Sequence, residues 1–359
     1  MSRRTFGRAG RRQLVLALAA MALLVVTACS SGSSAGRAAP SVSGAISGGS
    51  TASSPNPFAG DDAWIAYQTS RSGTEGVWLI HPDGTDDHRI AAGTEKEQLL
   101  PDWSPDGKRI VFTTRGGATE PLYAYDLATK RARQLFQCAD PCVGDDEPAY
   151  SPDGKKVAFS RALAAFVDSK EAGDQVPSDC GLWIGTVAGG KVEQITSNTR
   201  PACDREYNPR WSPDGSRLTY WRDPYRDGKP TGTAVYTVAA DGTHERRLTD
   251  PKMFAGDADW SPDGRWIVFS TYPLIECNFT PKISNLYRIH PDGTGLQQLT
   301  HNKSTDLRST QPRYTPDGKW IVLTAVKPDS RSLWAVPADG GTPDVIAEGG
   351  LHAHGTWQP

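Results

Sequence analysis

The sequence predicts an all-β protein, a six-bladed β-propeller of four-stranded blades whose ring is closed by the C-terminal strand. Three observations predict it: a turn motif that recurs every 47 to 61 residues, a second turn motif inside each repeat, and one repeat that is split between the two ends of the chain. The composition agrees, because 36 Gly, 27 Pro, 11 Trp and 11 Tyr are typical of short strands joined by tight turns.

The first motif is an aromatic residue followed by Ser-Pro-Asp-Gly, or by Thr-Pro-Asp-Gly in one copy, and then by an alternating apolar run. Pro presets φ at the second position of a turn, Asp accepts a hydrogen bond from the neighbouring backbone, and Gly tolerates the exit. Each repeat is therefore expected to open with a strand, a turn and a second strand. The five copies begin at Trp103, Tyr150, Trp211, Trp260 and Tyr314.

The second motif is Asp-Gly between two extended runs, which is a strong signal for a hairpin. Four short strands in each repeat are the layout of a propeller blade. The clearest copies follow the apolar runs 77–80, 235–238, 286–289 and 333–336.

The two ends of the chain supply the number of blades. The first repeat starts at Trp64 and lacks the opening motif, whereas residues 355–359 look like the missing strand and place Trp357 43 residues after Tyr314. We expect this strand to complete the blade begun by residues 61–93, which makes six blades and leaves no free edge. Four tryptophans are expected to pack between blades: Trp103, Trp211, Trp260 and Trp357.

The repeat resembles the WD-like repeats of the TolB family, which also occur in the propellers of prolyl oligopeptidase-type peptidases. The resemblance covers residues 61–359 and implies the fold and a tendency to bind proteins. TolB has a separate domain before its propeller, and the peptidases add an α/β-hydrolase domain. We expect neither here, because residues 30–60 have the Ser/Gly/Pro-rich composition of a flexible tether.

Residues 1–29 have the features of a lipoprotein signal peptide. The apolar run from Leu14 to Val26 is too short to span a bilayer, and it ends in Val-Thr-Ala before Cys29, which resembles a bacterial lipobox. The resemblance implies lipidation of Cys29 and a location at the cell membrane, lipid-anchored on the extracytoplasmic side. Residues 2–6 also resemble a twin-arginine signal, with the general secretory route as the alternative.

The charge distribution excludes nucleic acid as a partner. Residues 1–28 carry five Arg and no acidic residue, which leaves 34 basic and 41 acidic residues in the rest of the chain. No Ser/His/Asp or Cys/His arrangement can be assigned to catalysis, and no phosphate loop with a Lys occurs at the required spacing.

Long connections are predicted on one face of the propeller. Both turn motifs lie on the same face, here called the turn face, and the remaining connections lie on the opposite loop face. Long loops grouped on one face favour a binding surface for a protein, peptide or cell-wall partner, with tolerated insertions as the alternative. These connections span residues 161–181, 197–206, 222–232 and 271–284.

The cysteines after Cys29 all map to the loop face, and an exported protein meets an oxidising medium. Cys138 and Cys142 can close a small local ring, and Cys180 can reach Cys203 and hold two loops together. Cys277 is then left free or pairs between molecules, since pairings cannot be deduced from the sequence. A zinc site is the alternative for Cys138 and Cys142.

A ring of equivalent positions is predicted around the central channel, three residues before each opening aromatic. Its members, here called the channel ring, are Leu100, Glu147, Asn208, Asp257, Gln311 and His354. His352 lies on the same side of the last strand as His354. These side chains could bind a small ligand or a divalent metal ion, which would support a metal-assisted polysaccharide lyase or hydrolase. His-x-His at a strand start also distantly resembles the metal site of oligogalacturonate lyases, which have seven blades. A hydrated polar channel is the further alternative.

Overall fold

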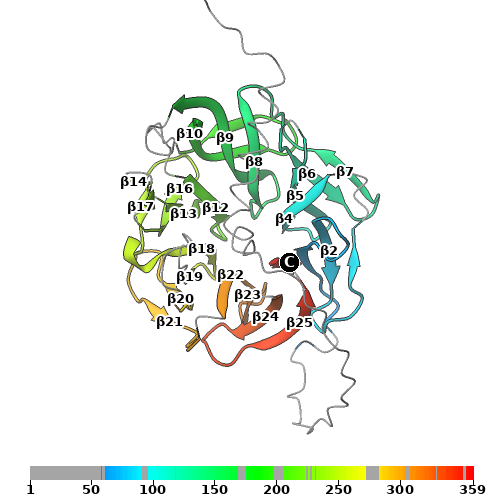
Figure 1. Cartoon of the computed structure of the whole chain (residues 1–359), viewed down its shortest axis with the longest axis vertical. Helices are drawn as coiled ribbons and strands as arrows, with labels where there is room; N and C mark the ends of the chain where they lie inside the picture. Colours follow the sequence, from blue (N-terminus) through cyan, green and yellow to red (C-terminus); the bar gives the residue numbers. More distant parts are fainter. Residues whose placement is uncertain are drawn as a thin grey trace, which may run out of the picture.

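The computed structural model describes Phe58 and residues 61–90, 96–117, 119–168, 175–196, 205–223, 225–226, 229–230, 232–271, 283–304, 307–328, 330–350 and 353–359. These residues form six four-stranded antiparallel sheets that surround a central axis as the blades of a propeller (Figure 1). The predicted fold class is confirmed. Each blade is numbered here in chain order, with its strands given from the axis outward.

Blades 1 to 3 contain the first half of the ring. Blade 1 consists of β26 (Ala353–Trp357), β1 (Ile65–Thr69), β2 (Gly76–Ile80) and β3 (His88–Arg89). Blade 2 consists of β4 (Glu97–Trp103), β5 (Arg109–Arg115), β6 (Leu122–Asp126) and β7 (Arg131–Gln134). Blade 3 consists of β8 (Cys142–Tyr150), β9 (Lys156–Asp168), β10 (Gln175–Thr186) and β11 (Val192–Gln194).

Blades 4 to 6 contain the second half. Blade 4 consists of β12 (Arg205–Trp211), β13 (Arg217–Asp223), β16 (Ala234–Ala239) and β17 (Arg246–Arg247), with a separate pair formed by β14 (Tyr225–Arg226) and β15 (Lys229–Pro230). Blade 5 consists of β18 (Ala255–Trp260), β19 (Ile267–Thr271), β20 (Leu286–Ile289) and β21 (Gln297–Gln298), and the 3₁₀ turn η1 (Pro251–Met253) precedes it. Blade 6 consists of β22 (Arg308–Tyr314), β23 (Trp320–Lys327), β24 (Ser330–Pro337) and β25 (Asp344–Gly350).

The C-terminal strand closes the ring, as predicted. β26 pairs antiparallel with β1, and Trp357 lies opposite Ile65 in the ladder. The backbone N–H of Gln358 donates to the carbonyl of Trp64 at 2.7 Å, and its side chain donates to the carbonyl of Gly107 in blade 2 at 2.9 Å. Residues from the two ends of the propeller are therefore held in one blade, which also contacts its neighbour.

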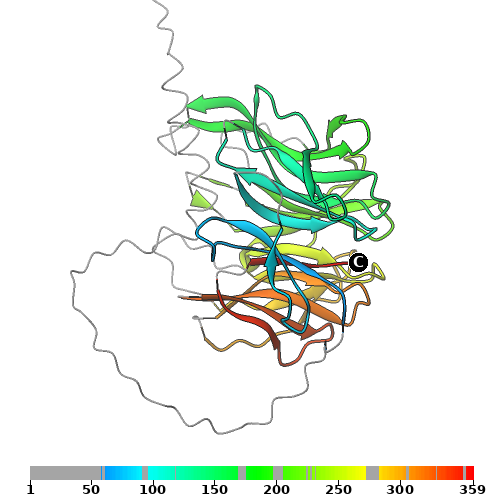
Figure 2. The ribbon, with the colours of Figure 1, turned by 90° about the vertical axis from the view of Figure 1, so that its right-hand side faces the viewer.

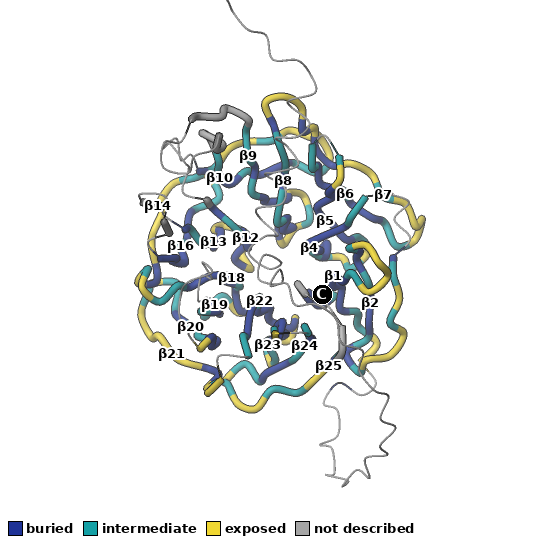
Figure 3. Tube along the Cα trace, viewed as in Figure 1, coloured by how far each residue is buried: buried dark blue, intermediate teal, exposed yellow. Residues whose placement is uncertain are grey.

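The core is divided among the interfaces between blades, because each sheet buries both faces against its neighbours. Figure 3 shows the inner strands as mostly buried and the outer rim as exposed. Six apolar clusters occupy the six interfaces, and the four predicted tryptophans belong to them. Two of these indole N–H groups bond across an interface: Trp103 donates to the carbonyl of Thr356 at 3.0 Å, and Trp211 donates to that of Ala149 at 3.1 Å.

The Ser-Pro-Asp-Gly turns close by hydrogen bonds within the motif. Ser104 donates to Asp106 at 2.6 Å, and Gly107 adopts a φ of 64° that suits its position at the turn exit. A Cβ atom added at Gly154, the equivalent residue of blade 3, would lie 3.5 Å from Pro105. The turns of neighbouring blades are thus in contact on the turn face.

The signal peptide, Cys29 and the tether lie outside the described residues. Within the described part of the chain, no helix is long and apolar enough to cross a membrane. Lipidation of Cys29 and the export route stay predictions.

Candidate functional site

The channel ring shares a backbone feature that its sequence pattern does not reveal. The φ angle is 56° at Leu100, 54° at Glu147, 56° at Asn208, 51° at Asp257 and 55° at Gln311. At each of these positions the pairing between the innermost strand and the second strand shifts register. A left-handed residue at a register shift is a β-bulge, which re-aims side chains near functional sites. Five blades therefore carry a bulge at the same height along the channel.

The bulges bring four polar residues of the channel ring together. Glu147 Oε2 accepts a hydrogen bond from the backbone N–H of Asn208 at 2.6 Å. The amide of Asn208 donates to Asp257 Oδ1 at 3.0 Å, and Asp257 Oδ2 accepts from the backbone N–H of Gln311 at 3.2 Å. The result is a continuous chain of hydrogen bonds over blades 3 to 6. It gives acceptors to backbone N–H groups at two bulges, which burial would otherwise make costly.

The remaining positions of the channel ring differ from these four. Leu100 contributes no polar side chain, and its backbone N–H donates to Gln68 Oε1 at 3.0 Å. His354 lies in β26, but its side chain is outside what the structure describes, and His352 lies outside the described residues. Metal binding by the two histidines stays a prediction.

Glu147 has the most perturbed environment among the acids of the channel ring. Burial raises the pKa of its carboxyl well above the usual range, and the charges of Asp146 and Asp257 raise it further. The protonated form is thereby favoured, and a neutral carboxyl is a poorer cation ligand than a carboxylate.

A second layer of six residues, four of them charged, lies directly before the opening aromatics, and sequence reasoning missed it. We call it the charged layer; its members are Asp102, Ala149, Arg210, Asp259, Arg313 and Thr356. Arg210 Nη1 donates to Asp102 Oδ1 at 2.7 Å, although these residues lie two blades apart. The intervening position is Ala149, whose short side chain leaves room for the long reach of Arg210.

A pocket of about 280 Å³ opens beside the charged layer on the turn face. All six members of the layer line it, together with four of the aromatic residues that follow them, the prolines of two turns and the C-terminal proline. These aromatic and proline residues are Trp103, Tyr150, Trp211, Tyr314, Pro105, Pro152 and Pro359. The sequence signal that could have found this pocket is the alternation of acidic and basic residues one position before the aromatics of blades 2, 4, 5 and 6.

Arg313 is the most deeply buried cation of the charged layer. Burial lowers the pKa of its guanidinium to about 10, and the neighbouring charge of Arg210 lowers it too, whereas Asp259 opposes the shift. Arg313 Nη2 donates to Asn208 Oδ1 at 3.0 Å, and Nη1 donates to the carbonyl of Pro312 at 2.8 Å. The guanidinium thus links the charged layer to the channel ring and stays charged at neutral pH.

The predicted irregular connection over residues 161–181 is instead a paired extension of two strands. β9 and β10 contain 13 and 12 residues, against 5 and 4 in the equivalent strands β19 and β20. Their ladder runs from Lys156 opposite Thr186 to Asp168 opposite Gln175. Figure 2 shows this hairpin extending beyond the ring on the loop face, opposite the face that carries the C-terminus.

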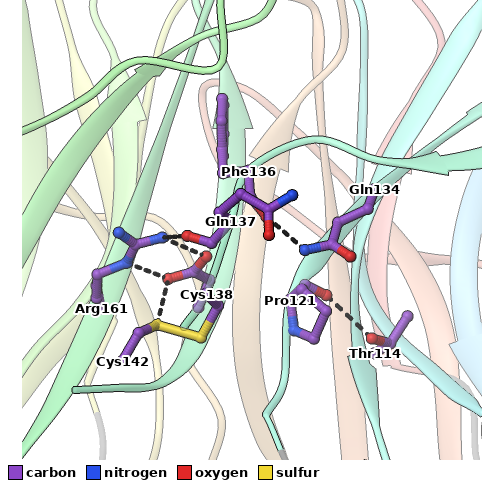
Figure 4. The surroundings of a disulfide bond; sticks show 9 residues. Thr114, Pro121, Gln134, Phe136, Gln137, Cys138, Cys142 and Arg161 are labelled. Atoms are coloured by element: carbon purple, nitrogen blue, oxygen red, sulfur yellow. Dashed lines mark hydrogen bonds and ion pairs between the residues drawn. A yellow bond between two sulfur atoms is a disulfide. The ribbon is translucent and has the colours of Figure 1, made fainter. Parts of the chain in front are cut away.

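A disulfide lies beside the base of the β9–β10 hairpin, and an ion pair joins β9 to β8 there (Figure 4). Cys138 and Cys142 form a disulfide, as predicted. Arg161 donates to the two carboxylate oxygens of Asp145 at 2.6 and 2.8 Å, and it also donates to the carbonyl of Gln137 at 3.2 Å. Asp145 is fully buried and Arg161 is 6 % exposed. Two parallel charge-assisted bonds of this kind fix the orientation of both side chains.

Of the other cysteines on the loop face, only Cys180 is among the described residues. Cys180 is disulfide-bonded, but its expected partner Cys203 lies outside the described residues, as does Cys277. In the described ranges, the group of potential metal ligands that lies within 4.8 Å consists of Cys138, Cys142 and Asp145. The sulfurs of that group are bonded to each other, and they are not available as thiolate ligands.

Comparison with known proteins shows which of them share this architecture. No family model matches the chain. The TolB structure from Acinetobacter baumannii superposes with a TM-score of 0.62 at 18 % identity, and the match covers 83 % of this chain and 67 % of that one. The chain has the TolB-like propeller fold. At this identity the likeness shows the fold alone.

Two sequence relatives match part of the chain. The protein Atu1656 of Agrobacterium fabrum is 27 % identical over 243 residues, which are 67 % of this TolB-like propeller chain and 70 % of the relative. The Tol-Pal system protein TolB of Francisella tularensis is 25 % identical over 189 residues, which are 52 % of this chain and 38 % of TolB. The chain thus matches little more than a third of that TolB.

A solved lyase shares the architecture as well. An oligogalacturonate lyase in complex with manganese superposes on this TolB-like propeller with a TM-score of 0.56 at 17 % identity, over 79 % of this chain and 73 % of the lyase. The likeness is again one of fold.

Proposed function

We propose that this TolB-like propeller is a non-enzymatic binding module, anchored by a lipid on Cys29 outside the cytoplasm, that docks a protein, peptide or cell-wall partner on its loop face. The observation that carries the proposal is the extended β9–β10 hairpin with its braced base. The Ser/Gly/Pro-rich tether would let the propeller reach a partner at some distance from the membrane.

The hairpin is a suitable docking element because it is long and held in place. A two-stranded hairpin that leaves its sheet is marginally stable in water. The Cys138–Cys142 disulfide and the buried ion pair of Arg161 with Asp145 lie where the hairpin leaves blade 3. Restricting the hairpin before binding lowers the entropy that docking would cost.

The relatives favour a protein among the possible partners. The Francisella relative is named a Tol-Pal system protein, and its match to this chain supports a role within an assembly of proteins. The acidic balance of the chain after residue 28 argues against an anionic polymer as the main partner.

Site-directed photocrosslinking in living cells tests this proposal. A photoreactive residue would be placed at position 168 or 175 in the hairpin, and at position 327 or 330, which are the matching ends of β23 and β24 in blade 6. We expect a discrete adduct from the hairpin positions alone. Equal adducts from both blades, or none from the hairpin, would contradict docking through it. The Cys29→Ser variant tests the anchor, since it should release the protein from the membrane fraction.

A metal-assisted polysaccharide lyase or hydrolase remains the second candidate. It is favoured by the manganese-bound lyase that shares the fold and by the meeting of Asn208 and Asp257 in the channel ring. Elemental analysis of the exported protein, purified without chelators or a histidine tag, tests this candidate. About one equivalent of a transition metal that is lost in His354→Ala would favour the enzyme, and a metal-free protein would count against it.

A further inference from the structure

The pocket on the turn face contains two opposite charges that do not pair. Asp259 and Arg313 are on the innermost strands of neighbouring blades, and both line the pocket of about 280 Å³. Among the described residues neither side chain forms an ion pair: Asp259 accepts from the backbone N–H of Tyr314 at 3.0 Å, and Arg313 donates to Asn208 and Pro312 oxygens. All these partners are uncharged.

The other two charges of the pocket are already matched. Arg210 pairs with Asp102 at 2.7 Å, and the second oxygen of Asp102 accepts from the backbone N–H of Tyr150 at 2.9 Å. Asp102 has thus a bond on each oxygen. Arg210 retains one unused donor, because its buried Nε has no hydrogen-bond partner among the described residues. Among the described residues that line the pocket, the buried polar atoms without a hydrogen-bond partner are Arg210 Nε and the hydroxyl oxygens of Tyr150 and Tyr314, while Asp259 and Arg313 have hydrogen bonds but no ion pair.

Burial makes this arrangement costly without a ligand. Arg210 and Arg313 are 9 % and 7 % exposed, and two guanidinium groups near each other repel. A buried charge is stabilised when an opposite charge with good hydrogen-bond geometry is brought to it. The carboxylate of a ligand would form ion pairs with the guanidinium groups, and the ammonium group of a ligand would form an ion pair with Asp259.

We propose that this pocket binds a small zwitterion of the size of a free amino acid, with its carboxylate at Arg313 and Arg210 and its ammonium group at Asp259. The formal charges of the two Asp and two Arg residues of the charged layer sum to zero. A simple anion or cation therefore gains no binding free energy from the net charge of the pocket. A ligand with both charges gains from each half of the pocket. The volume of about 280 Å³ lies just below the range of roughly 300 to 1,000 Å³ for small-molecule sites, which favours a small ligand.

This site is separate from the proposed docking surface. The pocket opens on the turn face beside Pro105 and Pro152, whereas the β9–β10 hairpin projects on the loop face (Figure 2). Loss of one function is therefore not expected to remove the other.

Isothermal titration of the purified full-length chain tests the proposal, in a buffer without amino acids or carboxylates. The probes are glycine, β-alanine and 4-aminobutyrate, which separate the two charges by increasing lengths, with acetate and methylammonium as single-charge controls. We expect at least one zwitterion to bind with a submillimolar dissociation constant and both controls to bind at least tenfold more weakly. Failure of all three zwitterions, or acetate binding as tightly as the best of them, overturns the proposal.

Variants then assign the two ends of the ligand. Asp259→Asn keeps an acceptor for the Tyr314 N–H but removes the negative charge. Arg313→Lys keeps the positive charge but removes the paired N–H donors of the guanidinium group. We expect each to weaken the best zwitterion at least tenfold, while Asp62→Asn, an exposed acid at the start of the described propeller, leaves it unchanged. Unchanged binding by a folded Asp259→Asn protein would overturn the proposal; the wild-type comparison of zwitterion with acetate decides it if the variants do not fold.

Discussion

Arg210 extends past Ala149 to form an ion pair with Asp102 two blades away, with 2.7 Å between Nη1 and Oδ1. Both side chains are largely buried. The pair therefore connects blade 2 to blade 4 beside the axis, in addition to the contacts that each blade makes with its immediate neighbours.

Removing the acid of this pair should cost more than removing both partners. In Asp102→Asn, the amide oxygen can still accept from Tyr150, but Arg210 is left buried without an opposite charge. We expect the free energy of unfolding to fall by about 3 kcal/mol, measured by urea denaturation. The double variant Asp102→Asn/Arg210→Met should recover more than half of that loss. A single variant that loses under about 1 kcal/mol would show that the pair is dispensable.

Ring closure should depend on the last strand. Deletion of residues 352–359 removes β26, Trp357 and the bonds of Gln358 to Trp64 and Gly107. Both ends of the ring then expose an interface, and we expect the cooperative thermal transition to be lost in calorimetry. The point variant Trp357→Ala should cost about 3 to 5 kcal/mol, whereas Leu296→Ala, at a side chain that is 48 % exposed, should cost little. A truncated chain that melts like the full-length protein would rule out closure by this strand.

The fold could be predicted from the sequence because the turns that define each blade are specified by residues close together in the chain. The Ser-Pro-Asp-Gly turn closes through bonds within the motif, such as Ser104 to Asp106, and the repeat then counts the blades. The pattern of Trp103 and Trp357 likewise predicts interblade packing that the structure confirms.

The channel was harder to predict because its decisive contacts join distant blades. The sequence pattern placed Glu147, Asn208, Asp257 and Gln311 at one height, but residue type does not signal a left-handed φ at Gln311 or Leu100. The pairing of Arg210 with Asp102 depends on the size of the residue between them.

Stability near blade 3 should depend on pH through Glu120. This carboxyl is 20 % exposed, and burial raises its pKa to about 7, with Arg115 opposing the shift and Asp146 adding to it. Between pH 4.5 and 7 the folded chain keeps a proton that the unfolded chain has released, so the free energy of unfolding falls as pH rises. The fall should reach about 3 kcal/mol relative to Glu120→Gln. Denaturation curves at pH 4.5 and 7.5 check this, and parallel pH profiles of the two proteins would contradict it.

The braced base of the β9–β10 hairpin should respond locally when its contacts are removed. In Asp145→Asn, Arg161 loses a charged partner to which it makes two bonds in a buried site. We expect faster hydrogen exchange in the ladder around Arg161 and Gly181, which are paired at the base. The double variant Cys138→Ser/Cys142→Ser should lower the free energy of unfolding by only about 2 kcal/mol, because the disulfide closes a short loop.

The reference for this comparison is the ladder of β19 and β20 in blade 5, which among the described residues has neither contact nor extension. Because the hairpin projects from the ring, loosening its base should raise exchange there while exchange in blade 5 stays at the wild-type rate. An equal increase in the hydrogen-exchange rate of both blades would mean that Asp145 and Arg161 stabilise the propeller as a whole. That result would contradict the interpretation of the hairpin as a separately braced docking element.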